Sequence, residues 1–180
     1  HSTQKWAGFV TLGLVVFFLA YGTYNAYNPI VRSYDIKIAK GSSNLDGLHI
    51  ALAADTHFGL LSGKSHAERL VKEINALNPD IILLPGDLFD DDIQPFLDQR
   101  IFQILSKLHA PYGVYASLGN HDRHDGTMQE IIDALENSGI NILYDDIVEV
   151  QGKFTLIGRK DRIDKDRLPL DSLMNDVNLS

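Results

Sequence analysis

Short apolar runs alternate with segments of helical periodicity along most of the chain, and this pattern predicts its elements. The runs predict six strands, over residues 48–54, 80–84, 114–118, 140–143, 147–150 and 154–158. Apolar residues that recur every three or four positions predict helices over residues 95–108 and 127–137, and a further one that begins near Ser65 as its N-cap. Strands that alternate with helices imply a largely parallel sheet layered with helices.

The longest apolar stretch lies at the start of the chain. Residues 6–31 carry no formal charge, and residues 9–20 are almost wholly apolar. A helix of about 22 residues rises roughly 30 Å, which is enough to cross a bilayer. Aromatic side chains at both ends are typical of interfacial anchors. We predict a transmembrane helix and its flanks over residues 1–30; a signal peptide cleaved near Ala20 and Gly22 and a buried globular helix remain open alternatives.

The soluble domain is predicted over residues 31–180. Its first residues, 34–39, alternate between polar and apolar side chains, which predicts an exposed edge strand. Position 1 is His rather than Met, and residues 171–180 resemble a helix and its exit. We therefore expect the sequence to be part of a longer protein.

The amino-acid composition limits the kinds of partner and metal site that the chain is expected to have. The chain has 180 residues, 24 of them acidic and 16 basic, for a formal net charge of −8. This balance disfavours a surface built for nucleic acid, so no nucleic-acid partner is expected. It leaves a phosphate substrate open, because bound divalent cations reverse the local field. The sequence contains no cysteine, which excludes disulfides and thiolate metal sites.

Three polar motifs follow three of the predicted strands. They are Asp-x-His at residues 55–57, Gly-Asp-x-x-Asp at residues 86–90 and Gly-Asn-His-Asp at residues 119–122. Loops after parallel strands converge on one edge of the sheet, where sites are built. Asp, His and Asn are ligands of divalent metals. The three motifs together therefore predict a metal centre.

The residue types suggest a division of labour. Asp55 and His57 are two positions apart and could ligate one ion, whereas the two oxygens of Asp87 could bridge two ions. Asn120 offers an amide oxygen, and His121 is left to handle a proton. Two ions about 3.5–4 Å apart can clamp a phosphoryl group and lower the pKa of a shared water. His121 would protonate the leaving oxygen, since an imidazole pKa of about 6.5 suits that task.

In order and context, the motifs resemble those of the calcineurin-like metallophosphoesterases, over about residues 48–158. With its apolar N-terminal segment, the chain resembles the membrane-anchored bacterial branch of that superfamily. The resemblance implies a layered α/β/β/α sandwich, of which this chain would hold the N-terminal part behind a transmembrane helix. It also implies two divalent metal ions, which Asp, His and Asn would accept as Mn, Fe or Zn.

The resemblance also assigns roles to single residues. It makes Asp55 and His57 ligands of the first metal, Asp87 the bridge, Asn120 a ligand of the second metal and His121 the catalytic residue. Asp90 and Asp122 would hold loops and orient the ligands. His124 and Arg159 are candidates for substrate contact, although a plain surface position is the more common role for each. The family completes its site with a Gly-His-x-His motif, which this sequence lacks, and we expect those ligands beyond its end.

The leading functional hypothesis is a membrane-tethered phosphoesterase that uses the metal pair to activate a hydroxide and cleave a phosphate monoester or diester. A lipid or envelope phosphate is an attractive substrate on grounds of location. By resemblance, the domain is expected on the outer face of the cell membrane, with the bilayer and a phosphate ester as partners and no obligate protein partner. The alternatives are a nuclease of the same superfamily, a tethered binding or scaffold protein with an inactive fold, and a sensor with a structural metal.

Overall fold

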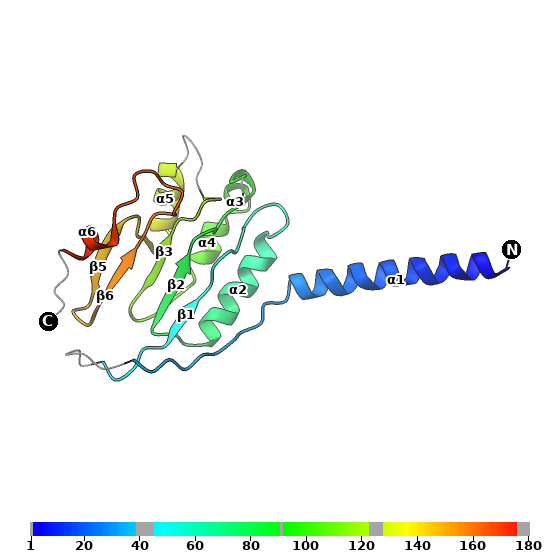
Figure 1. Cartoon of the computed structure of the whole chain (residues 1–180), viewed down its shortest axis with the longest axis horizontal. Coiled ribbons are helices and arrows are strands. Elements are labelled where there is room, and N and C mark those ends of the chain that lie inside the picture. Colours follow the sequence, from blue (N-terminus) through cyan, green and yellow to red (C-terminus); the bar gives the residue numbers. More distant parts are fainter. Residues whose placement is uncertain (1, 39–44, 91, 123–127, 176–180) are drawn as a thin grey trace. The chain divides into compact units, whose positions relative to one another are not determined.

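The computed structural model describes residues 2–38, 45–90, 92–122 and 128–175, and the chain divides into two compact units, His1–Ile38 and Ala39–Ser180. The first unit is built on helix α1 (Ser2–Ala26) (Figure 1). Its segment Thr3–Ala26 has a mean hydropathy of 1.7 over its most apolar window, none of which is buried. A helix is thus present where the apolar run predicted one, and its length and composition make it a candidate membrane span.

The predicted edge strand at residues 34–39 is wrong where it can be checked. Residues 34–38 carry no strand, and Ala39 lies outside the described residues. Ile36 and Ile38 are 79% and 84% exposed. Alternation marks a strand only when a neighbouring strand takes up its backbone hydrogen bonds, and a local pattern does not reveal whether that neighbour exists.

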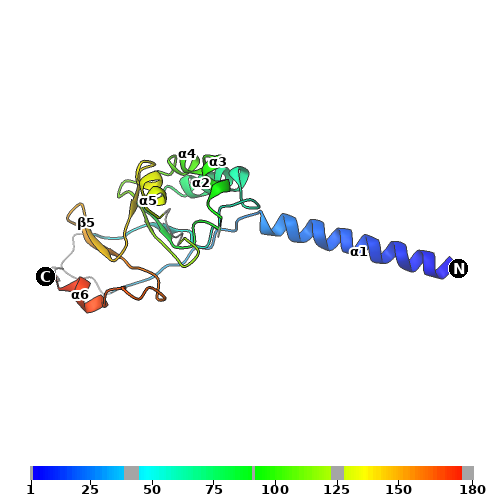
Figure 2. The same ribbon diagram turned by 90° about the horizontal axis from the view of Figure 1, so that it is seen from above.

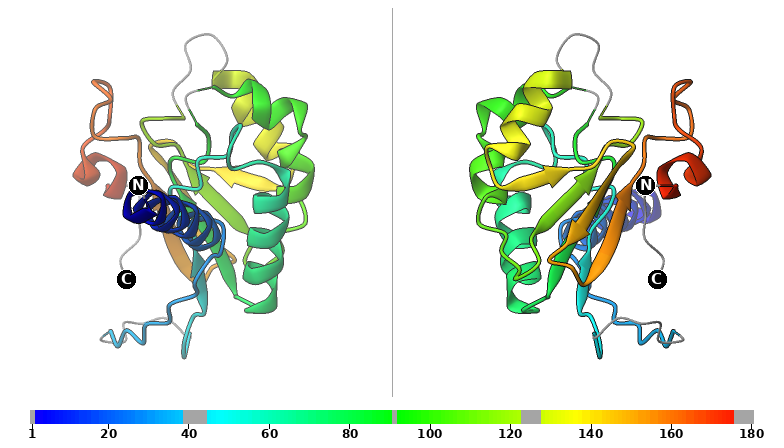
Figure 3. Two further views of the ribbon diagram at one scale, coloured as in Figure 1. Left: turned by 90° about the vertical axis from the view of Figure 1, so that its right-hand side faces the viewer. Right: turned by 90° about the vertical axis from the view of Figure 1, so that its left-hand side faces the viewer.

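A four-stranded parallel sheet organises the second unit. Its strands lie in the order β1 (Ile50–Leu52), β2 (Ile81–Pro85), β3 (Val114–Ser117) and β4 (Ile140–Ile142). The connections carry helices α2 (Lys64–Ala76), α3 (Gln94–Asp98), α4 (Ile101–Leu105) and α5 (Met128–Glu136). Figures 2 and 3 show these helices on one face of the sheet. The predicted mixed α/β fold with a parallel sheet is therefore confirmed.

The core lies between the sheet and these helices. On the sheet, Ala51, Ile82 and Leu84 are buried, and α2 contributes Ala67, Val71 and Ile74. The alternate positions of β1 are open, because Ile50 and Leu52 are 46% and 65% exposed. The helix layer thus covers one face of the sheet and leaves the opposite face open at β1.

An antiparallel hairpin follows the parallel sheet. It pairs β5 (Asp146–Val150) with β6 (Phe154–Gly158), and a short helix α6 (Leu170–Met174) comes after it. The views in Figure 3 place the hairpin on the face of the sheet away from the helices. Gly158 packs on Leu143, whose carbonyl oxygen would lie 2.7 Å from a Cβ at that position. The close approach seats β6 beside the end of β4.

The single helix predicted over residues 95–108 is wrong: two short helices, α3 and α4, replace it. The chain turns at Arg100, which adopts the left-handed conformation with φ 52°. Phe96 and Ile101 are both fully buried. Five positions span about 500° of a continuous helix, which would aim these two side chains about 140° apart. The turn allows both to enter the core.

The start of α2 also differs from its prediction. The N-cap is Gly63, and Ser65 is an exposed residue inside the first turn. The Lys64 N–H donates to Oε1 of Gln99 at 2.8 Å. A side chain 35 residues away thus caps this helix end, and no local pattern could predict that.

His66 gives the second unit a pH dependence that can be tested. The side chain packs edge-on against Phe58, and burial, followed by the charge of Arg69, lowers its pKa. The unfolded chain holds this proton more tightly, so the free energy of unfolding should fall as the pH drops below about 6.5 and stay level above it. Since the ring is partly solvated, the slope should be well under about 1.4 kcal/mol per pH unit.

Urea denaturation across that pH range would measure the slope, and His66→Gln should flatten it. The same change at exposed His109 is the matched control. An unchanged slope in His66→Gln would assign the pH dependence to another group.

Candidate metal centre

The loops after β1 and β2 run side by side beyond the ends of their strands. Backbone hydrogen bonds of 2.8–3.2 Å continue the parallel pairing, from Asp55 to Gly86, His57 to Asp87, Phe58 to Leu88 and Asp90 to Phe58. Thr56, buried between the two candidate ligands, donates its hydroxyl to the Leu88 carbonyl at 3.1 Å. The first two motifs are therefore tied together by main-chain contacts.

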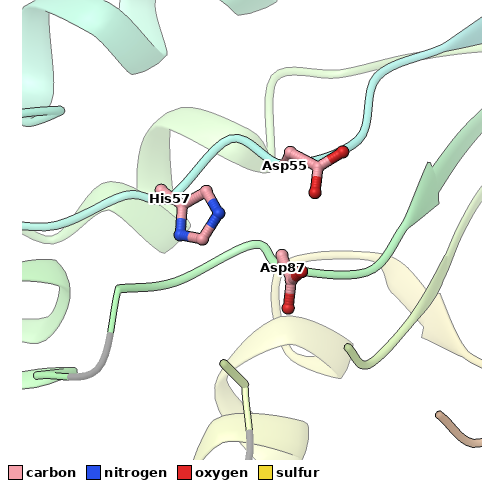
Figure 4. A group of neighbouring side chains, drawn as sticks. All are labelled: Asp55, His57 and Asp87. Atoms are coloured by element: carbon pink, nitrogen blue, oxygen red, sulfur yellow. The ribbon is translucent and has the colours of Figure 1, made fainter. Parts of the chain in front are cut away.

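This pairing brings three predicted metal ligands into one group. One ligand atom from each of Asp55, His57 and Asp87 lies within 4.8 Å of the others. Figure 4 shows the first two on the loop after β1 and the third on the loop after β2. Donors about 2.1 Å from one shared ion lie at most about 4 Å apart, so small side-chain rotations would suffice. Two carboxylates and an imidazole fit a divalent metal.

All three of these residues have strained backbones. Their φ angles are positive, at 53° for Asp55, 42° for His57 and 49° for Asp87. Such conformations cost on the order of 1 kcal/mol or more for residues other than glycine, and they gather at functional sites. The hydrogen bonds between the two loops hold the strained residues in place.

The third motif packs directly on Asp87. The His121 N–H donates to Asp87 Oδ1 at 2.9 Å. Gly119 approaches so closely that a Cβ there would lie 2.6 Å from the backbone nitrogen of Asp87. Gly86, with φ +86°, turns the chain beside it. The loop after β3 can reach the centre only because position 119 has no side chain.

His121 lies beside the three-ligand group. Its ring is half-buried and meets the His57 ring edge-on, with centroids 5.0 Å apart. This position suits a group that exchanges protons at the edge of a metal centre. Asn120, the remaining predicted ligand, is exposed between Gly119 and His121, and its role stays a prediction.

Two further acidic residues stand near the centre in different ways. Asp90 places Oδ1 4.0 Å from Nδ1 of His57 and is half-exposed. Asp122 is fully buried and accepts N–H groups from Phe89 at 2.8 Å and from Gly119 at 2.7 Å. Burial raises the pKa of Asp122, and these two hydrogen bonds oppose the rise. Asp122 therefore joins the second motif to the third.

We expect Asp122→Ala to lower the free energy of unfolding by on the order of 3 kcal/mol, because a buried N–H of Phe89 and a partly buried N–H of Gly119 lose their acceptor. Asp122→Asn should cost less, since its single oxygen can accept from only one of them. Denaturant titration of both variants would measure the difference. Equal losses would show that charge or packing, rather than the two hydrogen bonds, makes the residue necessary.

The remaining predicted substrate contacts are Arg159 and His124. Arg159 follows β6 and donates to the Leu168 carbonyl at 2.6 Å, so it holds its own loop. His124 lies outside the described residues. Two residues whose side chains form hydrogen bonds between separate loops, Thr56 and Gln99, were not predicted. Thr56 had a weak signal, since a residue between two ligands points to the opposite side of the chain.

Comparison with known proteins relates this chain to one family of phosphoesterases. A family model described as calcineurin-like phosphoesterase matches residues 48–177. A Caenorhabditis elegans protein named as a metallophosphoesterase is 37% identical over 74% of this chain and 27% of its own length. A zebrafish (Danio rerio) transmembrane protein with a metallophosphoesterase domain is 30% identical over 72% of this chain and 30% of its own. Chlamydia trachomatis UDP-2,3-diacylglucosamine pyrophosphatase is 33% identical over 47% and 26%.

Proposed function

This chain belongs to the calcineurin-like phosphoesterase family, and we propose that it is part of a metal-dependent enzyme that hydrolyses a phosphate monoester or diester. The juxtaposition of Asp55, His57 and Asp87 at the sheet edge carries the proposal. The chain spans less than a third of the length of the three relatives described above. Its activity is therefore proposed for the whole protein rather than for this stretch alone.

The metal-binding roles follow the motif order. Asp55 and His57 would hold one divalent ion, Asp87 would be shared by two, and Asn120 would bind the second. When bound, such ions polarise a phosphoryl oxygen and acidify water. The chain's own contribution is positional, because the paired loops and the Asp87–His121 hydrogen bond orient these side chains before any ligand arrives.

His121 is proposed as the general acid that gives a proton to the leaving oxygen. Three observations support this role: its ring is partly accessible, it adjoins His57, and its backbone is fixed to Asp87. Asp90 and Asp122 are proposed to orient the loops around it.

A membrane location is proposed from two independent observations. Helix α1 is long and apolar enough to span a bilayer, and the zebrafish relative is named as a transmembrane protein. We propose residues 1–30 as the span with its flanks and residues 31–180 as the start of the phosphoesterase domain, on the outer face. The Chlamydia relative is named for a lipid-linked pyrophosphate substrate, which supports a lipid-bearing phosphate as the substrate class.

Hydrolysis of p-nitrophenyl phosphate and its bis-ester by the complete protein tests the proposal. The protein is first stripped of metal and then resupplied with Mn²⁺. Activity restored by metal is expected, and the ratio of the two rates gives the ester class. Bound metal without turnover on either ester would instead favour a binding or sensor protein with a retained fold.

We expect His121→Gln to lower kcat by about 10²–10⁴-fold, the usual contribution of a general acid, while metal content stays at the wild-type level. Steady-state kinetics and elemental analysis measure the two quantities separately. His109→Gln, at an exposed position, is the control. Loss of metal in His121→Gln would make this residue a ligand rather than an acid.

A further inference from the structure

Two adjacent leucines stand exposed beside the candidate metal centre. Leu60 and Leu61 are 79% and 76% exposed, at the tip of the loop between β1 and α2. His57 precedes them by three residues. Figure 1 shows this loop at the sheet edge where the motif loops emerge. Adjacent apolar side chains at a protruding tip indicate a surface that meets an apolar partner.

Contacts at the base of the loop hold this tip outward. The Gly59 N–H donates to the Ser62 carbonyl at 3.2 Å, which closes the turn around the two leucines. Gln99 joins the two sides of the base: its Oε1 accepts from the Lys64 N–H at 2.8 Å, and its Nε2 donates to the Gly59 carbonyl at 3.5 Å. Gly59 itself lies so close to Asp90 that a Cβ there would approach the Asp90 Cβ to 2.8 Å.

A groove rich in cations begins where this loop ends. It lies between α2 and the α3–α4 turn, and its polar lining consists of Lys64, Glu68, Gln99, Arg100, Gln103 and Lys107. Three cations thus face one carboxylate, in a chain whose net charge is −8. Lys64 Nζ lies 4.0 Å from Glu68 in an exposed pair, which neutralises little at such a distance. The groove is therefore locally positive.

We propose that the Leu60–Leu61 tip and this groove form a docking surface for an anionic lipid bilayer. The leucines would enter the boundary between headgroups and acyl chains, and Lys64, Arg100 and Lys107 would meet the headgroup phosphates. An apolar tip beside clustered cations is the combination that binds membrane surfaces. A stable protein interface normally needs about 1,000 Å² or more, which two leucines do not supply.

Chain connectivity supports the choice of a bilayer. Residues 27–49, which join α1 to β1, reach at most about 80 Å when fully extended. If α1 lies in a membrane, this linker limits how far the second unit can move away from that membrane. Leu60 follows His57 by three residues, so docking would bring the loop that carries His57 close to the lipid surface. The proposal does not depend on phosphoesterase activity, and a lipid-bearing substrate would gain from it.

The absence of cysteine makes the test direct, because one introduced cysteine is a unique labelling site. Leu60→Cys in the full chain would carry an environment-sensitive fluorophore, and the protein would be reconstituted into phosphatidylcholine vesicles with or without phosphatidylglycerol. We expect a blue shift in anionic vesicles and quenching by lipids spin-labelled about 5–10 Å below the headgroups. The matched control is Ile163→Cys, which replaces another exposed apolar residue, 61% accessible, and should show neither signal.

Charge variants give a second readout. Replacing Lys64, Arg100 and Lys107 by Gln should reduce the equilibrium constant for docking on anionic vesicles about fivefold per cation. Added salt should act in the same direction. Equal signals from the probes at positions 60 and 163 would overturn the proposal. A signal at position 60 that is the same in vesicles with and without phosphatidylglycerol would also overturn it. A shift in detergent that grows with protein concentration would also overturn it, in favour of a protein partner.

Vesicle flotation distinguishes membrane insertion of α1 from docking of the Leu60–Leu61 tip. Flotation reports whether α1 inserts into lipid, and the probe at position 60 reports whether the loop touches it. A chain that floats with a silent probe contradicts the docking surface alone.

Discussion

Asp87→Asn in the complete protein is expected to abolish metal-dependent phosphate ester hydrolysis and to lower the metal content per chain. Asparagine keeps an oxygen that can accept the His121 N–H, so the loop after β3 should stay in place. The change removes one negative charge and turns the second oxygen into an amide group that cannot ligate a cation. The loss should exceed the roughly 10–100-fold that removal of an outer hydrogen-bond partner of a metal ligand costs.

Elemental analysis and kcat/KM for the two p-nitrophenyl esters would measure this effect. Asp98→Asn, which makes the same change in charge at an exposed residue of α3, is the control. Denaturant titration should show that both variants remain folded. Turnover near the wild-type level in Asp87→Asn would remove the basis for a shared ligand between two ions.

Gly119→Ala is expected to disrupt the metal centre by steric contact alone. The new methyl group would collide with the Asp87 carboxylate and backbone nitrogen, the latter at 2.6 Å. Neither the sheet end nor the paired loops can move without breaking hydrogen bonds, so Asp87 must shift or the loop after β3 must leave. Overpacking of this kind costs about 1–3 kcal/mol of stability, and a displaced Asp87 would weaken metal binding as well.

Substitutions at two other glycines serve as controls that distinguish the effect of steric contact from the effect of backbone strain. Gly139 has φ +80° and open space around its Cβ position, so Gly139→Ala should cost about 1 kcal/mol of stability without affecting metal binding. Gly47 also has open space around its Cβ position, but its φ lies outside the left-handed region, so Gly47→Ala should change little. Isothermal titration with Mn²⁺ and urea denaturation would be applied to all three variants. If Gly119→Ala bound Mn²⁺ with the same affinity as Gly139→Ala, the close packing of Gly119 on Asp87 would not be needed for metal binding.

The sequence alone determined the class of fold and predicted the place of the candidate site. A strand buried by helices appears in the sequence as a continuous apolar run. A helix that packs on the core shows apolar residues every three to four positions. Both patterns can therefore be recognised within a short segment of sequence. The ends of the runs marked where Asp55, Asp87 and His121 would emerge, and the parallel order implied that they meet at one edge. The structure brings those three residues together at that edge.

The tertiary structure decided what depends on partners distant in the chain. Gln99 caps α2 from 35 residues away, the chain turns at Arg100 so that Phe96 and Ile101 both reach the core, and residues 34–38 form no strand despite their alternation. The approach of Gly119 to Asp87 and the hydrogen bond from the Phe89 N–H to Asp122 likewise join loops more than 30 residues apart. Local periodicity reports only which face of a segment is buried. The partner that buries it, or that takes up its hydrogen bonds, is set by how the whole chain packs.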